Sequence, residues 1–225
     1  MKPIIFSTPM VQAILEGRKT MTRRVMKPLP MLHKDGTYFY RGCFDLRHHK
    51  DVVIQDYSPY KPGDILWVRE TFQESQKDEK GNCIIVFCPA DEDITCGDVG
   101  CIFGDRKYLY RADEYYEQPY GNNVSIYDNL KWRPSIYMPK EAARIFLQVK
   151  DVRGEQVQDI SIQDAKAEGV SILDHTMRGG YSDDDSPHYK ESFAELWDRI
   201  NAKKGYDWEI NPFVWVIEFE RMENL

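Results

Sequence analysis

The sequence has no apolar run that approaches the roughly 18–20 residues needed to cross a bilayer, so it predicts no transmembrane helix and no membrane partner. The segment from Met1 to Ser7 holds only a short apolar run, so we expect no signal peptide. We therefore expect a cytoplasmic protein. The chain has no internal repeat and no low-complexity segment, and its 225 residues suit one large domain.

Positive charge is also scarce, because 30 Lys and Arg residues stand against 37 Asp and Glu residues and give a net charge of -7. Affinity for long nucleic acids comes mostly from neutralised phosphates, so this balance disfavours indiscriminate nucleic-acid binding. It still permits a local basic pocket for a nucleoside or a single nucleotide.

Cysteine is sparse, and an odd number of five in a chain expected to be cytoplasmic argues against disulfides. Four of the five lie close together, with four-residue gaps inside each pair: Cys83, Cys88, Cys96 and Cys101. Such gaps fit a zinc site, but the apolar run 84–87 favours a strand in which the cysteines are small apolar residues. His48 and His49 lack a second ligand pair and favour a solvated loop. We expect no metal and no cofactor.

The stretch Gly17-Arg18-Lys19-Thr20-Met21-Thr22-Arg23-Arg24 departs from this acidic background, because no acid falls between Glu16 and Asp35. A lysine near a threonine can activate the hydroxyl as a nucleophile when burial or nearby cations lower the lysine pKa. Arginines offer planar forks for phosphate, carboxylate or a base edge. The alternative interpretation is a basic turn on a solvated surface.

A helix is predicted before this stretch and a strand after it. Thr8 and Pro9 mark a helix start, and Gly17 marks its end. Residues 20–26 follow as a strand. In an unbroken strand Lys19 and Thr22 face opposite sides, so their cooperation requires Lys19 to lie in the turn or a bulge to intervene.

The rest of the chain alternates short strands with single helices. Apolar patterns predict strands over 65–72, 107–111, 144–152 and 213–219, and helices over 161–168 and from residue 186. We expect residues 28–62 to be a long excursion with one hairpin and residues 131–139, bracketed by prolines, to be extended. This pattern predicts an α+β fold, a partly closed β-barrel with flanking helices.

Glu168 falls in the last turn of its predicted helix, where the helix dipole disfavours a carboxylate. We therefore expect Glu168 to have another partner in the folded protein.

Several of these stretches together resemble the ASCH family of the PUA-like superfamily. The resemblance rests on the motif from Gly17 to Arg24, the turn and strand 63–68, the helix 161–169 and the final strand 214–219. Within the family the chain is most similar to prophage-encoded proteins, on the segments 5–10, 67–72 and 134–139. The remaining segments are interpreted as long loop insertions, at about 31–59, 76–104, 113–130 and 171–187.

The resemblance implies a single PUA-like domain over residues 1–225, with a cleft that holds RNA or a nucleobase. One enzyme group of the family hydrolyses N4-acetylcytidine to cytidine and acetate. Its lysine, threonine and glutamate fall on Lys19, Thr22 and Glu168 of this chain. These three residues are the expected base, nucleophile and acid.

Five further residues are candidates for substrate binding. Arg23 and Arg24 offer cationic forks beside the expected catalytic residues. Trp67 and Tyr137 could stack on a base, although Trp67 lies in an apolar strand and is also a candidate core residue. Glu70 closes that strand, where an ordinary ion pair with Arg69 is the alternative to a position at a pocket mouth.

Together these observations predict an amidohydrolase, an enzyme that acts on an acylated base or nucleoside. One alternative is a module that binds RNA or a modified base without chemistry. Another is a ribonuclease that uses the same basic cluster. The acidic net charge disfavours the ribonuclease most. The sequence does not define the oligomeric state.

Overall fold

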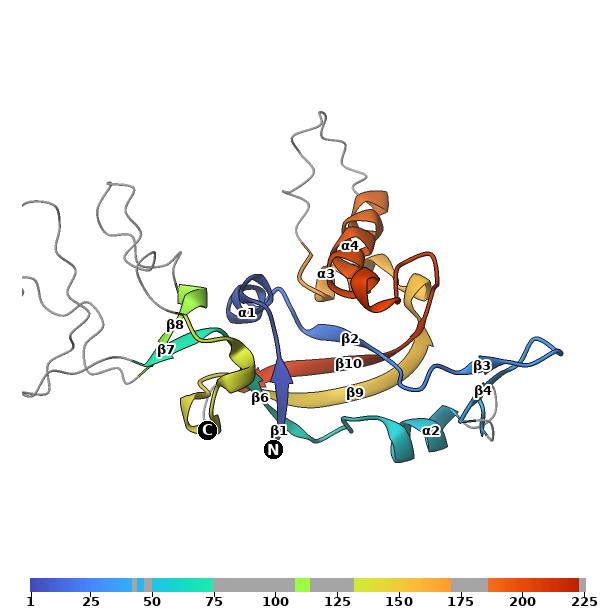
Figure 1. Cartoon of the computed structure of the whole chain (residues 1–225), viewed down its shortest axis with the longest axis horizontal. Helices are drawn as coiled ribbons and strands as arrows, with labels where there is room; N and C mark the ends of the chain where they lie inside the picture. The colour runs from blue at the N-terminus through green and yellow to red at the C-terminus, as the bar shows by residue number, and fades with distance from the viewer. Residues whose placement is uncertain (42–43, 47–49, 75–107, 114–131, 171–185, 223–225) are drawn as a thin grey trace, which may run out of the picture. The chain divides into compact units, whose positions relative to one another are not determined.

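The computed structural model describes residues 1–41, 44–46, 50–74, 108–113, 132–170 and 186–222 (Figure 1). The chain divides into two compact units. The first unit comprises residues 1–2, 13–66 and 145–225, and the second comprises residues 3–12 and 67–144. The predicted single domain over residues 1–225 stays a prediction.

Three antiparallel strands form the centre of the first unit: β2 (Met21–Val25), β9 (Phe146–Gln156) and β10 (Phe213–Met222). β10 lies between the other two (Figure 1). Its residues from Val214 to Ile217 are apolar and buried at every position, as expected for a strand covered on both faces. The register places Arg23 opposite Val216 and Thr22 opposite Ile217.

The whole sheet has the order β1-β6-β9-β10-β2, which adds β1 (Lys2–Ile5) and β6 (Ile65–Arg69). This order confirms that the strands predicted near 65–70, 144–152 and 213–219 share one sheet. Among the described residues the sheet is open, with β1 and β2 at its edges, so the predicted closure into a barrel is not seen there. The mixture of helices and strands confirms the α+β class.

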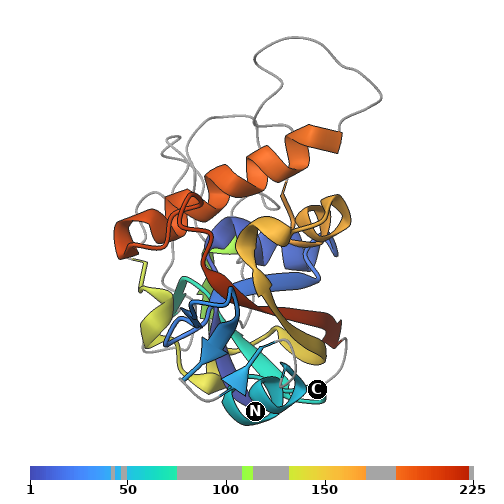
Figure 2. The same cartoon turned by 90° about the vertical axis from the view of Figure 1, so that its right-hand side faces the viewer.

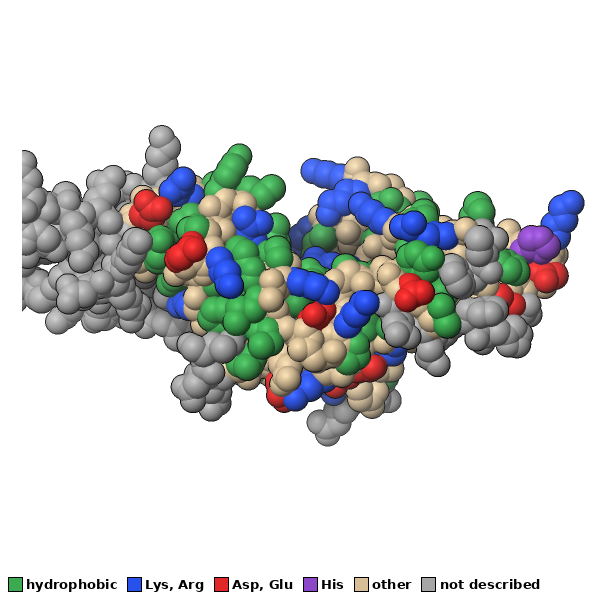
Figure 3. All heavy atoms as spheres, turned by 90° about the horizontal axis from the view of Figure 1, so that it is seen from below, with side chains coloured by type: hydrophobic (Ala, Val, Ile, Leu, Met, Phe, Trp, Pro, Cys, Tyr) green, Lys and Arg blue, Asp and Glu red, His purple; other side chains and the backbone are tan. Residues whose placement is uncertain are grey.

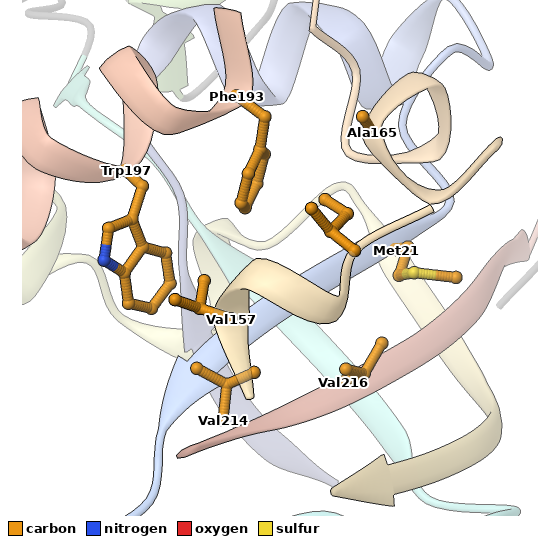
Figure 4. Close-up of a cluster of buried hydrophobic side chains, with 8 residues drawn as sticks. Met21, Val157, Ala165, Phe193, Trp197, Val214 and Val216 are labelled. Atoms are coloured by element: carbon orange, nitrogen blue, oxygen red, sulfur yellow. The ribbon is translucent and has the colours of Figure 1, made fainter. Parts of the chain in front are cut away.

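Helices cover both faces of the first unit's strands. α3 (Ile162–Ala167) and α4 (Ser186–Asn201) lie on one side, and α2 (Lys50–Tyr57) lies on the other (Figures 1 and 2). Under α3 and α4 a buried cluster joins helices and strands (Figure 4): Met21, Val157, Ile160, Ala165, Phe193, Trp197, Val214 and Val216. Burying a side chain as large as Phe193 stabilises a fold by roughly 1.5–3 kcal/mol.

The first helix begins and ends as the sequence predicts. α1 spans Thr8–Leu15, with Val11 and Ile14 on its buried face. Gly17 follows in the left-handed region with φ 76°. A residue with a side chain is strained at such a φ value, so glycine is the residue that lets the chain turn directly into the basic stretch.

The described residues within 28–62 include the predicted hairpin and also contain elements that were not predicted. They form the small sheet β3-β4-β5 (Met31–Leu32, Tyr38–Tyr40 and Phe44–Asp45) followed by α2. Tyr40 is 1% exposed, and its hydroxyl donates to the Lys27 carbonyl at 3.0 Å. The Tyr38 ring packs edge-on against Phe213 of β10. Each of these strands has only two or three residues, which is too short for an alternating pattern to predict it. Contacts of single aromatic rings with distant parts of the chain hold the strands in place.

The second unit contains the antiparallel pair β7 (Phe72–Glu74) and β8 (Tyr108–Tyr110) and three short 3-10 helices: η1 (Arg111–Asp113), η2 (Ser135–Tyr137) and η3 (Lys140–Ala142). The prediction of an extended segment over 131–139 is wrong at η2. Pro134 precedes η2, where a missing N–H is tolerated, and its carbonyl accepts from the Tyr137 amide at 3.0 Å. The described part of the first unit also contains the 3-10 helices η4 (Val157–Asp159) and η7 (Ala202–Lys204).

Some predictions fall on residues outside the described ranges. These are the four clustered cysteines, His48 and His49, the insertion 76–104 and nearly all of the insertions 113–130 and 171–187. The expectations of no zinc and no disulfide therefore stay predictions. In the described part of the chain, no helix combines the length and the apolar character needed to cross a membrane.

Candidate functional site

Lys19 lies between α1 and β2 with its side chain fully enclosed. Its amide donates to the Ala13 carbonyl at 2.9 Å, and its backbone forms an isolated antiparallel bridge with Glu168. The ammonium nitrogen Nζ donates to Glu168 Oε2 at 2.7 Å, to the Glu168 carbonyl at 2.8 Å and to the Met21 carbonyl at 2.8 Å. Lys19 therefore lies in the turn before the strand, one of the two arrangements that the sequence required. Three hydrogen bonds account for all three protons of an ammonium group.

Glu168 is brought to Lys19 by the end of α3. Ser161 caps the start of this helix by accepting from the Asp164 amide at 3.1 Å. Glu168 is the C-terminal cap residue, 4% exposed, and its carboxylate contacts Lys19 and Arg23. These cations are the partners that the unfavourable helix position predicted.

Gly169 allows the close approach of the two segments. It has φ 79°, and a Cβ atom at this position would lie 2.9 Å from the Cβ atoms of both Ala13 and Lys19. Such distances are shorter than real Cβ contacts allow. Glycine is thus required here twice, for its backbone conformation and for the space that Lys19 occupies.

Burial controls the protonation of Lys19. It lowers the Lys19 pKa below the ordinary value of 10.5, and the nearby Glu168 carboxylate opposes this shift. The charges of Arg24 and Arg23 lower the pKa further. Burial and the two arginines therefore favour the neutral amine of Lys19, whereas Glu168 favours the ammonium.

Arg23 holds the carboxylates of the site in place. Its guanidinium donates to Glu155 Oε1 at 2.7 and 3.2 Å, to Asp164 Oδ2 at 2.8 Å and to Glu168 Oε1 at 3.2 Å. The guanidinium also lies over the Phe193 ring, with Cζ 5.6 Å from its centroid. Because its fork already serves three carboxylates, the geometry favours a positioning role over the predicted contact with substrate.

Thr22 and Arg24 lie on the sheet face opposite to Arg23. Side chains alternate along a strand, and the register pairs Thr22 with Ile217 and Arg24 with Trp215. Thr22 is 3% exposed. The Met21 carbonyl that binds Lys19 Nζ belongs to the peptide bond that joins Met21 to Thr22, so the ammonium lies beside the Thr22 backbone. The Thr22 hydroxyl is not one of the three acceptors of Lys19 described above.

Arg24 is half-buried. Burial lowers its pKa below the ordinary value of an arginine, and the nearby Tyr60 and Glu168 act in the opposite direction. The pKa of Tyr60 is raised, mainly by burial, although the charge of Arg24 opposes that shift. Arg24 thus carries a half-buried positive charge on the Thr22 face.

The three other predicted substrate-binding residues belong to the second unit. Trp67 is 9% exposed, and Arg69 lies over its ring at 5.2 Å. Glu70 is 1% exposed and accepts from Arg144 at 2.9 and 3.0 Å, so its ion pair is with Arg144 and not with Arg69. Tyr137 is 67% exposed in η2. Their roles toward a substrate stay predictions.

Three charged residues around the site were not anticipated: Glu155, Asp164 and Arg153. Asp164 accepts from Arg153 at 2.5 Å as well as from Arg23, and Arg153 also donates to Glu155 at 3.2 Å. A signal was present for Asp164, which precedes Glu168 by four residues and so shares its helix face. Arg153 and Glu155 are two residues apart on β9 and share its face, but that pairing alone indicates no target.

Comparison of the chain with known protein families, with curated proteins and with solved structures finds no match.

Proposed function

We propose that this chain is an amidohydrolase of the ASCH type, within the PUA-like superfamily, that removes an acyl group from the exocyclic nitrogen of a modified base or nucleoside such as N4-acetylcytidine. The observation that carries the proposal is the enclosed pair formed by Lys19 Nζ and Glu168 Oε2, 2.7 Å apart. Burial, together with the charges of Arg24 and Arg23, lowers the pKa of Lys19, and this favours the neutral amine that a base requires.

The pair supplies a base and an acid together. A proton passing from Lys19 Nζ to the Glu168 carboxylate leaves a neutral amine and a neutral carboxylic acid. The amine then accepts the Thr22 hydroxyl proton. This step requires Lys19 Nζ to exchange its hydrogen bond to the Met21 carbonyl for one with the Thr22 hydroxyl. Base assistance of this kind supplies about 10²–10⁴-fold in rate.

The acyl group then moves in two steps. The Thr22 oxygen bonds to the amide carbonyl carbon, and the carbonyl oxygen becomes an oxyanion that the charge of Arg24 stabilises. When the C–N bond breaks, Glu168 gives its proton to the leaving exocyclic nitrogen, and the acyl group remains on Thr22. Water then attacks this ester, the carboxylic acid leaves, and the Thr22 hydroxyl is restored.

The surface charge favours a small substrate. The net charge is -7, and over the middle of the face in Figure 3 basic and acidic side chains are interspersed. A long nucleic acid gains its affinity from an extended positive surface. A free base or nucleoside requires only the local charge of residues such as Arg24.

A module that binds a modified base without chemistry is the second candidate. It is favoured by the three hydrogen bonds of Lys19, which satisfy an ammonium completely and leave no proton unpaired. On this alternative Lys19 is a fixed positive charge, and a permanently charged substitute serves equally well.

Single-turnover acetate release from N4-acetylcytidine separates the two candidates. We expect release by wild type, partial release by Thr22→Ser, which keeps a hydroxyl, and none by Lys19→Arg, since a guanidinium stays protonated. The matched control is Lys166→Arg on the exposed side of α3, which should behave as wild type. Equal rates for wild type and Lys19→Arg would eliminate the mechanism. Binding of N4-acetylcytidine without release by any variant would establish the binding module.

A further inference from the structure

Two arginines lie on the same face of the first unit's sheet, on either side of β10. Arg23 of β2 and Arg153 of β9 are both register partners of Val216, which belongs to the buried cluster under α3 and α4. Neighbouring strands lie about 4.8 Å apart, so only two strand spacings separate these cations. Like charges this close on a partly buried surface repel each other unless anions lie between them.

Two carboxylates lie between these arginines and join them into a closed arrangement. Asp164 Oδ2 accepts from Arg23 at 2.8 Å and from Arg153 at 2.5 Å. Glu155 accepts from Arg23 at 2.7 Å through Oε1 and from Arg153 at 3.2 Å through Oε2. The two positive and two negative charges cancel. We call Arg23, Arg153, Glu155 and Asp164 together the charge ring.

The charge ring determines which N–H groups of Arg23 are directed at Glu168. Nε and Nη2 donate to Glu155 and Asp164, with the shortest distances at 2.7 and 2.8 Å. Nη1 donates to Glu168 Oε1 at the longer distance of 3.2 Å. A longer hydrogen bond is a weaker one. Arg23 therefore orients the Glu168 carboxylate while its strongest contacts are made with the two other carboxylates.

The proposed reaction makes this division of contacts useful. It requires the Glu168 carboxylate to take a proton from Lys19 Nζ. A neighbouring cation favours the charged form of a carboxylate, so the uncompensated charge of Arg23 would oppose that transfer. The negative charges of Asp164 and Glu155 offset the charge of Arg23.

Asp164 also acts through the helix that carries Glu168. It lies four residues before Glu168, about one turn of α3. Its hydrogen bonds to Arg23 and Arg153 tie this turn to β2 and β9. The end of α3 is thus held at the sheet beside Lys19.

We propose that Asp164, Glu155 and Arg153 are positioning residues of the proposed reaction: they hold Arg23 so that one weak hydrogen bond orients Glu168, which can still take the Lys19 proton. The proposal rests on the proposed function, because the proton transfer that it serves is a step of that reaction. It gives a role to the charged residues that the sequence did not indicate.

Asp164→Asn removes the negative charge and keeps the shape of the side chain. In acetate release from N4-acetylcytidine its kcat should fall by up to about 10²-fold, the loss that a misplacement far from the chemistry can cause. KM should stay unchanged, since the charge ring has no proposed contact with the substrate. Asp164→Glu keeps the charge and should retain more of the rate. The matched control is Asp159→Asn at the exposed end of η4, which should behave as wild type.

NMR titration of ¹³C-labelled Lys19 gives a readout that needs no turnover. The charged groups that act on Lys19 are Glu168, Arg24 and Arg23. Without the anion of Asp164, Arg23 repels the ammonium more strongly, so the pKa of Lys19 should lie lower in Asp164→Asn than in wild type. A merely structural loss would admit water to the site and would move this pKa toward the ordinary value of 10.5.

The outcomes separate the role of the charge from the role of the shape. The proposal is overturned if Asp164→Asn keeps the kcat of Asp159→Asn, or if its kcat is closer to wild type than that of Asp164→Glu. It is equally overturned if the Lys19 pKa in Asp164→Asn equals or exceeds that of wild type. If circular dichroism shows Asp164→Asn to be unfolded, Glu155→Gln tests the same charge from β9.

Failure of the proposed function has a different signature. It would appear as the absence of acetate release by wild type itself. The Lys19 titration then decides alone, and an unchanged or raised pKa in Asp164→Asn would overturn the action of the charge ring on Lys19 and Glu168.

Discussion

Two carboxylates are buried to nearly the same extent in this chain, yet their partners differ in kind. Glu168 is 4% exposed and pairs with Lys19, whereas Glu70 is 1% exposed and accepts both hydrogen bonds of an Arg144 fork. A lysine changes its charge when burial lowers its pKa, but an arginine stays protonated. Burial alone therefore does not indicate a chemical role. The partner decides whether a buried carboxylate can exchange a proton or can only hold a charge.

The largest expected effect concerns turnover. Lys19→Arg should lower the single-turnover rate on N4-acetylcytidine by about 10²–10⁴-fold, because it removes the base. The reciprocal change Arg144→Lys keeps a cation beside Glu70 and should change the chemical step far less. Similar losses in the two variants would show that both pairs serve structure and would remove the distinction drawn here.

The second expected effect is on stability. Removal of one partner from a buried ion pair costs about 3–5 kcal/mol, and we expect a loss of this size for Glu168→Ala at pH 7. The loss should shrink at pH 9.5, because the unpaired Lys19 can become neutral. Glu70→Ala should lose less, since Arg144 is 27% exposed, and its loss should not change with pH. Urea unfolding at both pH values measures these quantities; a pH-independent loss for Glu168→Ala would contradict the expectation.

The approach of α3 to Lys19 can be tested with two glycines of nearly equal φ. Gly169→Ala and Gly205→Ala each place a side chain at a left-handed position, with φ 79° and 78°, which costs about 1–2 kcal/mol. Only Gly169→Ala also meets Lys19 and Ala13, whereas a Cβ at Gly205 meets nothing within 4 Å. We expect the larger loss of stability and a loss of turnover for Gly169→Ala alone. If thermal unfolding showed equal losses of stability for the two variants, the segments around Gly169 and Lys19 would have moved apart to accept the new side chain without further cost.

The smallest expected effect is on the pH profile. Because the folded pKa of Lys19 is lowered, the unfolded state binds more protons between the folded value and 10.5, and stability should rise with pH across that interval. The kcat/KM of wild type should rise with pH to a plateau, with its midpoint below 10.5. The residual activity of Glu168→Gln should show a still lower midpoint, since the carboxylate that raises the Lys19 pKa is gone. A midpoint at or above 10.5 in wild type would exclude Lys19 as the base.

Several elements of the fold could be predicted because their signals are local. Thr8, Pro9 and Gly17 bound α1, and the Ser161 cap starts α3 where the pattern indicated. One hairpin was predicted within residues 28–62, but the bounds of β3 to β5 were not, because these short strands depend on contacts such as that of Tyr38 with Phe213, far away in the sequence. The 3-10 turn at Ser135 was missed because proline restricts a backbone without selecting the turn that follows it.

The residues of the candidate site could be predicted from the motif, but most of the ion pairs between them could not. The need of Glu168 for a partner followed from its place at the end of a helix, and Lys19 supplies that partner. The partners of the Arg23 side chain could not be predicted, because Asp164 and Glu155 are both distant from it in the sequence. The sequence shows which charged residues are present. Which of them contact each other depends on how the strands pair in the fold.

The bridge between Lys19 and Glu168 joins residues 149 positions apart in the chain. During synthesis Lys19 therefore emerges long before its carboxylate, and it stays hydrated and fully protonated in the nascent chain. β2 waits even longer, since its partner β10 spans Phe213–Met222. Contacts of such separation close slowly because the loop entropy is lost before the contact forms. The buried base is therefore made at the end of folding, so that recovery of catalysis in a refolding experiment should lag behind the return of helical signal.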